Sequence, residues 1–348
     1  MQVIEHLAHF NLKKIIPLFL FIISIQTFAQ VYPDKSVHTI LKSGIKLIVD
    51  QKYSDAELIF NQLDKTRKDL PLGKIYLAAT LIAKSFDYAQ PFDDSSITKN
   101  LDGAKRICER LLKTDDKNIW YNYFYALTKG YTAYYDALKG DWLSALSIGL
   151  SSVSSFEYCL QLDDKFYESM IAIGSYKFWR SKKTDFINWL PFIPDEKDIG
   201  IEYLQKAIQH SGYNSHLAVH SLIWIYIEQE EYKSAVKIAE FALKSNPQSR
   251  LFRWGLARAY EKVDPEKSIK LYYEILESYP KDLKSNKVNE VTLKHLIAQQ
   301  LFKLGNKEEA LKLCNQILLI QGFTKFEQDK LNDRLERVRI FKNELMQK

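Results

Sequence analysis

The sequence predicts an all-α fold: a right-handed α-solenoid of about seven stacked antiparallel helix pairs, closed by a C-terminal capping helix. Two segments, Leu217–Pro247 and Leu251–Pro280, each follow the order of helix, tight turn, helix and closing proline, and their prolines lie 33 residues apart. Repetition at such a period is typical of stacked helical repeats. Glycine is scarce, at 12 of 348 residues, and no run of alternating apolar and polar residues predicts a strand.

Small residues recur where the two helices of a pair are expected to cross. Gly44 precedes Ala56 by 12 positions, and the same interval recurs near the C-terminus. In the less regular middle of the chain, Gly174 and Gly200 take the same role. Two antiparallel helices approach closely only where each presents a small side chain, and the larger side chains around it then interlock with the next pair.

The residues that carry this pattern resemble the tetratricopeptide repeat (TPR) family. In the clearest unit, Leu222, Tyr226 and Ala235 recur at helical spacing on either side of a short polar break. The resemblance is good over residues 217–322 and fair over 37–68, and between these ranges the repeats are degenerate, with insertions. It implies a concave groove lined by the first helix of each pair.

The predicted organisation follows the chain from one end to the other. A signal peptide at 1–29 precedes degenerate repeats with long helices at 37–164, a helix pair at 166–213 with an aromatic insert at 181–195, regular repeats at 216–322 and a capping helix at 325–347. Within the second pair, residues 89–100 are expected to form an inserted loop. No linker rich in Pro, Gly or Ser divides the mature chain, so we expect one continuous array.

The first 29 residues resemble a secretory signal. Lys13 and Lys14 precede the apolar run Ile15–Ile25, and residues 27–29 (Thr-Phe-Ala) form a small-x-small cleavage site. A membrane span needs about 20 apolar residues, so this run predicts no stable span after cleavage, with an uncleaved anchor as the alternative. The ending is similar to the leaders of exported Bacteroidota proteins. We therefore expect cleavage after Ala29 and a periplasmic or secreted product.

Enzyme signatures are absent from the sequence, which contains no GxGxxG, GK[ST], HExxH or GxSxG motif. Its 49 basic and 43 acidic residues give a net charge of +6 and are mixed along the chain, without the basic stripe of a nucleic-acid binder. These observations predict a protein that is not an enzyme, uses no cofactor and binds no nucleic acid.

His216 and His220 lie four residues apart on one face of a predicted helix, a spacing that can hold a metal ion. No third ligand with a definite role accompanies them. We therefore favour ordinary histidines of the helix surface or groove and predict no metal site.

The groove face that the TPR resemblance implies contains aromatic and arginine side chains, which are common binding anchors. The implied groove residues are Ser175, Trp179, His220, Trp224, Trp254, Arg258, His295 and Gln299.

Two aromatic segments allow two interpretations each. Residues 184–194 form an apolar stretch in a predicted loop, where Phe186, Trp189 and Phe192 either seal the solenoid or form a lid over a partner. The predicted helix 119–135 carries eight aromatic residues, more than one narrow stripe can hold. They either pack in the core or line the inner wall of the array.

The function that follows is a non-catalytic scaffold of the bacterial cell envelope that binds a protein or peptide partner in its concave groove. The alternative is a periplasmic helper of a transport system that binds a small sugar or lipid-like ligand. A deep enclosed cavity would favour the alternative, because such cavities suit small ligands.

Overall fold

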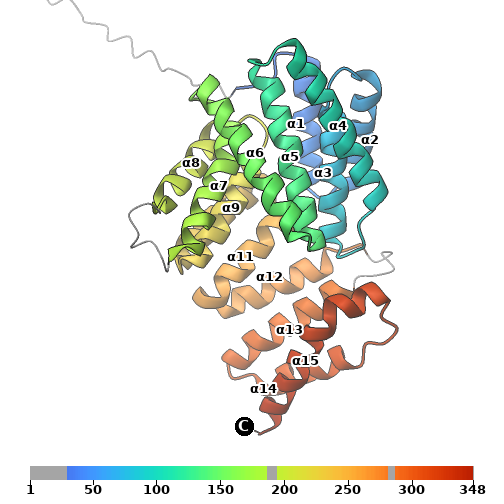
Figure 1. Ribbon diagram of the computed structural model, residues 1–348. Coiled ribbons are helices and arrows are strands. Elements are labelled where there is room, and N and C mark those ends of the chain that lie inside the picture. Colours follow the sequence, from blue (N-terminus) through green and yellow to red (C-terminus); the bar gives the residue numbers. More distant parts are fainter. Residues whose placement is uncertain (1–29, 186–193, 281–286, 348) are drawn as a thin grey trace, which may run out of the picture.

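The computed structural model describes residues 30–185, 194–280 and 287–347, and confirms the predicted all-α class (Figure 1). The described residues form helices and no strand. Consecutive helices pack as antiparallel pairs, which makes the fold TPR-like. The helices are α1 (Lys35–Val49), α2 (Tyr53–Thr66), α3 (Leu72–Asp87), α4 (Asp94–Thr114), α5 (Ile119–Lys139), α6 (Trp142–Leu162), α7 (Tyr167–Lys183), α8 (Lys197–His210), α9 (Ser215–Glu228), α10 (Tyr232–Ser245), α11 (Arg250–Val263), α12 (Pro265–Glu277), α13 (Lys287–Lys303), α14 (Lys307–Leu318) and α15 (Lys325–Gln347).

Local sequence signals explain where several helices begin and end. The Asp264 side chain accepts a hydrogen bond from the backbone N–H of Lys267, and Pro265 occupies the first helical position of α12, where its missing N–H is not needed. The long helices α5 and α6 are separated at Gly140, whose φ of +88° lies in the left-handed region that glycine adopts without strain.

The loop predicted at residues 89–100 is wrong over most of its length. Helix α4 begins at Asp94, and the Asp93 side chain caps it by accepting a hydrogen bond of 3.0 Å from the backbone N–H of Ser96. The polar run at 93–96 is therefore a helix N-terminus, because Asp and Ser favour caps as strongly as they favour turns.

The array curls so that its first two pairs meet its fifth and sixth pairs: Val49 of α1 packs in one hydrophobic cluster with Ile223 of α9 and Phe252 of α11. The backbone N–H of Tyr32 donates to the Tyr213 hydroxyl over 2.8 Å, and the Asn214 amide reaches the Tyr76 hydroxyl of α3 over 3.3 Å. Asp87, at the end of α3, forms an ion pair with Arg250, at the start of α11. The first eleven helices therefore form a closed turn, and their inner faces surround a central space.

Helices α13 to α15 extend beyond this turn (Figure 1). Phe341 of α15 packs against Phe302 and His295 of α13, with ring centroids 5.6 and 6.1 Å apart. The last helix thus covers part of the inner face of α13. Within the described ranges, no helix combines the length and apolar character that a bilayer crossing requires.

Candidate binding cavity

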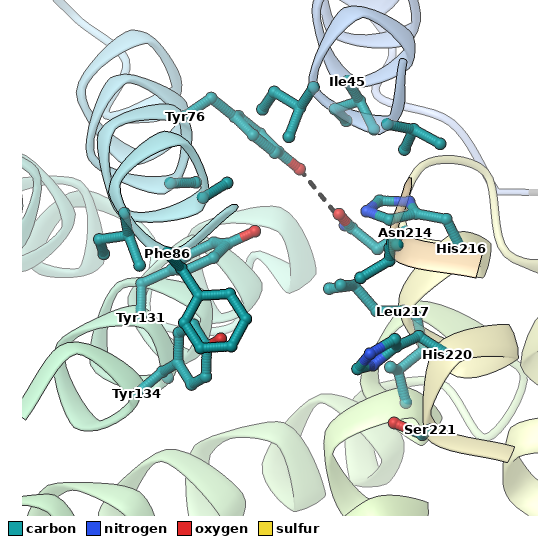
Figure 2. Close-up of a pocket in the computed structure, with 18 of the residues that line it drawn as sticks. Ile45, Tyr76, Phe86, Tyr131, Tyr134, Asn214, His216, Leu217, His220 and Ser221 are labelled. Carbon is teal, nitrogen blue, oxygen red and sulfur yellow. Dashed lines mark hydrogen bonds between the residues drawn. The ribbon is translucent and has the colours of Figure 1, made fainter. Parts of the chain in front are cut away.

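The curled inner wall surrounds a half-open cavity of about 820 Å³ (Figure 2). Its walls come mainly from α1, α3, α5, α7, α9 and α11, and most of the lining is aliphatic or aromatic. The lining includes Ile45, Ile48, Val49, Tyr53, Tyr76, Ala79, Ile82, Ala83, Phe86, Tyr123, Leu127, Tyr131, Tyr134, Phe156, Ile171, Ala172, Leu217, Trp224, Leu251, Trp254 and Tyr279.

The cavity has a mouth formed by α3 and α5. Phe86 and Tyr134 both line it, yet 60% of Phe86 and 48% of Tyr134 is exposed to solvent. Figure 2 shows these two rings together with Tyr131, facing Leu217 and His220 of α9 across the space. Large apolar side chains that stay exposed at an opening are typical of binding sites.

A buried polar cluster closes one end of the cavity. The carboxylate of Glu168, 3% exposed, accepts hydrogen bonds from the Tyr123 hydroxyl (2.9 Å), the Tyr213 N–H (2.6 Å) and the Asn214 side-chain amide (2.9 Å). Because a carboxylate only accepts, these contacts fix the Asn214 Nδ2 toward Glu168. The same Nδ2 lies 3.3 Å from the Tyr76 hydroxyl (Figure 2). Burial raises the pKa of Tyr123 well above its ordinary value, and the charge of Glu168 adds to the shift.

Histidines and serines of α7 and α9 form the polar side of the wall. The Trp224 indole N–H donates to Nε2 of His220 over 2.9 Å, one helical turn along α9. Ser175 and Ser221 hydrogen-bond to each other over 3.0 Å. Burial lowers the pKa of both His216 and His220 to about 4. Both imidazoles are therefore neutral at pH 7.

Because of these histidines, the stability of the folded protein should decrease as the pH is lowered. Each has a pKa near 4 in the folded chain and an ordinary value of 6.5, so the unfolded chain binds more protons between pH 6.5 and pH 4. The melting temperature of the native protein should therefore drop more steeply over this window than that of a His216→Gln/His220→Gln variant, which cannot titrate there. Circular dichroism melts at half-unit pH intervals measure the difference. Parallel curves for the two proteins would contradict the expectation.

Four of the eight predicted groove residues line the cavity: Ser175, His220, Trp224 and Trp254. They come from α7, α9 and α11, the first helices of their pairs. Their role in binding stays a prediction.

The other four lie away from the cavity lining. Trp179 is half-buried against the ring of Phe178, and Arg258 pairs with Glu261 on its own helix over 2.8 Å. His295 is only 2% exposed, because α15 covers it, and Gln299 is half-buried one turn further along α13.

Several lining residues come from helices that the groove prediction did not include. Tyr76 and Phe86 project from α3, and Tyr123, Tyr131 and Tyr134 from α5. Of the two interpretations of the aromatic helix 119–135, each holds for part of it. The other aromatic residues of α5 pack in the hydrophobic core: Trp120, Tyr121, Phe124, Tyr125 and Tyr135.

The predicted lid residues Phe186, Trp189 and Phe192 lie outside the described residues, as does the predicted signal peptide. In the part of the chain that the structure describes, no group of three His, Cys, Asp or Glu side chains is placed to hold a metal ion.

Comparisons with known proteins give a distant likeness in structure alone. No protein-family model matches the chain, and no curated protein matches it. A thermophilic TPR protein of Thermus thermophilus is 13% identical with a TM-score of 0.40, over 64% of this chain and 97% of that one. The C-terminal part of a TPR repeat-containing protein from Cytophaga hutchinsonii is 16% identical with a TM-score of 0.39, over 84% and 99%. Human IFIT1 with PPP-AAAA is 14% identical with a TM-score of 0.43, over 79% of this chain and 58% of that one. The assignment of the fold rests on the packed helix pairs of the chain itself.

Proposed function

We propose that this chain is a non-catalytic binding protein of the TPR type, which holds a small, largely apolar ligand in its central cavity. The half-open space of about 820 Å³, lined by aromatic and aliphatic side chains, supports this function. Pockets of roughly 300–1,000 Å³ with apolar walls and a few placed polar groups are typical of small-ligand sites.

The closed turn favours a small ligand, which was the alternative from the sequence, over the protein or peptide partner that the sequence predicted first. A peptide needs an open groove along which it can lie extended. Here the ion pair of Asp87 and Arg250 ties α3 to α11, and the Tyr32–Tyr213 hydrogen bond ties the segment before α1 to the segment before α9. Entry is then through the mouth at Phe86 and Tyr134, which suits a narrow molecule.

The polar groups of the wall are hydrogen-bonded to other protein groups, which suits a binding protein better than an enzyme. Glu168 already accepts four hydrogen bonds from its protein neighbours, and the Nε2 of His220 is occupied by the Trp224 N–H. Ser175 and Ser221 are hydrogen-bonded to each other. A nucleophilic serine needs a base whose nitrogen is free to take its proton. Because the Trp224 N–H occupies Nε2 of His220, the arrangement favours a binding role for Ser175 and Ser221. We expect the predicted signal at 1–29 to export the proposed binding protein to the periplasm or out of the cell.

Narrowing the cavity should weaken binding. Ala83 of α3 and Ala172 of α7 are half-buried lining residues, so Ala83→Trp or Ala172→Trp places an indole inside the space. We expect the native protein to bind the neutral fluorophore N-phenylnaphthylamine saturably at one site, and each variant to bind it at least about tenfold more weakly, because the close-packed wall cannot accommodate both. Fluorescence titration measures the affinities.

Leu143→Trp is the matched control, since Leu143 of α6 is 85% exposed and the added indole stays outside the cavity. Its affinity should equal that of the native protein. Equal affinity in all the filled variants, or binding that never saturates, would place the fluorophore elsewhere and refute the proposed function.

A further inference from the structure

The histidine at the centre of the polar wall has its proton fixed on one nitrogen. An indole N–H only donates, so the Nε2 of His220 that receives the Trp224 hydrogen bond carries no proton. A neutral imidazole then carries its proton on Nδ1. Burial lowers the pKa of His220 to about 4, which keeps the ring neutral at pH 7.

The Nδ1–H of His220 is available to a ligand. Its ring points into the cavity toward the aromatic residues of α3 and α5 (Figure 2). Among the residues that the structure describes, none accepts a hydrogen bond from this nitrogen. A donor held by its helix and by Trp224, and left without an acceptor in an apolar space, is a preorganised contact for a ligand oxygen.

The charges of the cavity disfavour an anionic ligand. The described lining residues include two carboxylates, Glu168 and Asp87, and neither a lysine nor an arginine. The nearby Arg250 guanidinium is already paired with Asp87. A second proton on His220 would have to occupy Nε2 and displace the Trp224 N–H. A ligand carboxylate would therefore lose its hydration without meeting a cation, which is strongly unfavourable in an apolar site.

We propose that the cavity selects an uncharged, elongated apolar ligand with an acceptor oxygen, of the alcohol, ester or ketone class, which accepts the hydrogen bond of the His220 Nδ1–H. This inference rests on the proposed function and adds the chemical class of the ligand. The apolar walls contact the hydrocarbon part of the ligand, and His220 recognises its polar group by a hydrogen bond.

Four probes of equal chain length test the class: hexadecanol, methyl hexadecanoate, hexadecanoate and hexadecylammonium. Each is titrated at pH 8, the ions below their critical micelle concentrations and the neutral probes below their solubility limits, against N-phenylnaphthylamine bound to the full chain. We expect the alcohol and the ester to displace the fluorophore, and both ions to compete at least about tenfold more weakly. Hexadecanoate meets no cation among the described lining residues of the cavity, and an ammonium group only donates, so it cannot accept the hydrogen bond of His220. Hexadecanoate or hexadecylammonium competing as well as the ester would overturn the inference. If the fluorophore binds the cavity but none of the four probes displaces it, the ligand class is also wrong.

Two variants test the role of His220 with these probes. His220→Phe keeps a ring of similar size and removes the donor, so ester and alcohol affinities should fall about 5- to 20-fold, while the affinity for the fluorophore, which needs no donor, should fall by a smaller factor. Trp224→Phe frees Nε2 and lets the proton move between the two nitrogens, so the ester affinity should fall by a smaller factor, about two- to fivefold.

His295→Phe is the matched control, because this buried histidine of α13 packs against Phe341 and is not among the lining residues of the cavity. It should change ester affinity by less than about twofold. Equal ester affinity in His220→Phe and the native protein, or a larger loss in His295→Phe, would overturn the inference. Retained fluorophore binding shows that each variant is folded. Failure of the fluorophore to bind the native cavity would instead refute the proposed function.

Discussion

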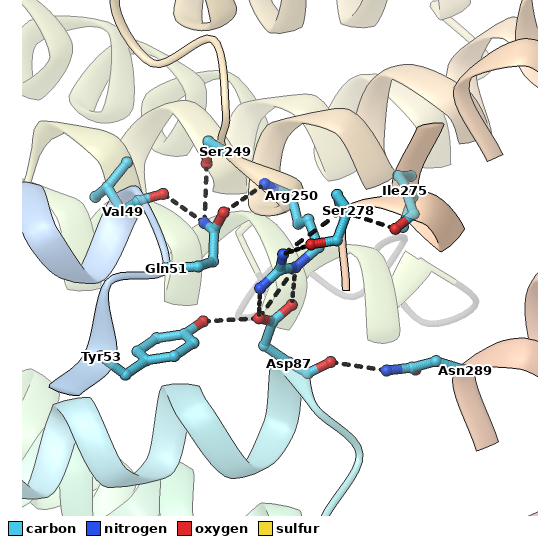
Figure 3. Close-up of polar contacts among 9 residues, drawn as sticks. All are labelled: Val49, Gln51, Tyr53, Asp87, Ser249, Arg250, Ile275, Ser278 and Asn289. Carbon is cyan, nitrogen blue, oxygen red and sulfur yellow. Dashed lines mark hydrogen bonds and ion pairs between the residues drawn. The ribbon is translucent and has the colours of Figure 1, made fainter. Parts of the chain in front are cut away.

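Replacing Arg250 by methionine is expected to lower the free energy of unfolding by about 3–5 kcal/mol, as measured by urea denaturation. Its guanidinium is 6% exposed and pairs with the carboxylate of Asp87, which is 12% exposed (Figure 3). Methionine fills a similar volume without the charge, so Asp87 is left ionised, poorly hydrated and without its cation. Breaking one side of a buried pair leaves the full desolvation penalty on the other.

The surroundings of this ion pair explain why it holds two distant parts of the chain together. Nε of Arg250 donates to Oδ1 of Asp87 over 2.9 Å, and Nη1 donates to the backbone carbonyl of Ser278 over 3.1 Å (Figure 3). The guanidinium also lies 4.6 Å from the centre of the Tyr279 ring. Burial acts to lower the pKa of Arg250, but the hydrogen bonds and charge of Asp87 raise it overall. The Tyr53 hydroxyl donates to the same carboxylate over 3.1 Å. Arg250 thus joins α3, α11 and the end of α12.

Two further variants make the expectation specific. Arg339→Met removes an arginine of α15 that is 57% exposed and paired with an equally exposed Glu336, so it should change stability by less than about 1 kcal/mol. The double variant Asp87→Leu/Arg250→Met should lose less than the sum of its single variants, because no charge is then left unpaired. A loss below about 1 kcal/mol for Arg250→Met would contradict the importance of this pair.

The contacts that close the turn could not be predicted from local patterns. Asp87 and Arg250 are 163 residues apart, and each occupies an ordinary helix end. Their meeting depends on the small rotation between successive helix pairs, summed over several pairs. The helix pairs themselves were predictable, because a cap and proline such as Asp264-Pro265, or a small residue at a crossing, acts within a few residues.

The candidate site shows the same division. His220 and Trp224 were predicted on the inner wall because the TPR pattern assigns that face to the first helix of a pair. The cluster of Glu168, Asn214 and Tyr123 was not predicted, because it joins α7, α5 and the segment before α9. The aromatic excess of residues 119–135 was the one signal for it in the sequence. An aromatic residue there favours burial, whether in the core or in a cavity wall, and only the packed structure separates the two.

Adding a single methyl group at the crossing of α7 and α8 is expected to destabilise the protein, although replacing glycine by alanine within a helix usually stabilises it. A Cβ on Gly174 would lie 2.7 Å from the backbone carbonyl oxygen of Gly200, and a Cβ on Gly200 would lie 2.6 Å from that of Gly174. Both neighbours are backbone atoms of helices and cannot move aside like a flexible side chain. Gly174→Ala and Gly200→Ala should therefore each lower the free energy of unfolding by about 2–3 kcal/mol.

Gly149→Ala of α6 provides the matched control for these two variants. A Cβ there would meet only the Cβ of Ala133, at an ordinary contact distance of 3.7 Å. Since alanine favours the helix over glycine, this variant should gain about 0.5–1 kcal/mol. The sign of the change thus separates a glycine required by the contact of two helix backbones from one that is not. If Gly174→Ala were as stable as the native protein in the same urea melts, α7 and α8 would have to lie further apart than the structure places them. The α7 residues Ser175 and Ala172, which line the cavity, would then lose the support that positions them.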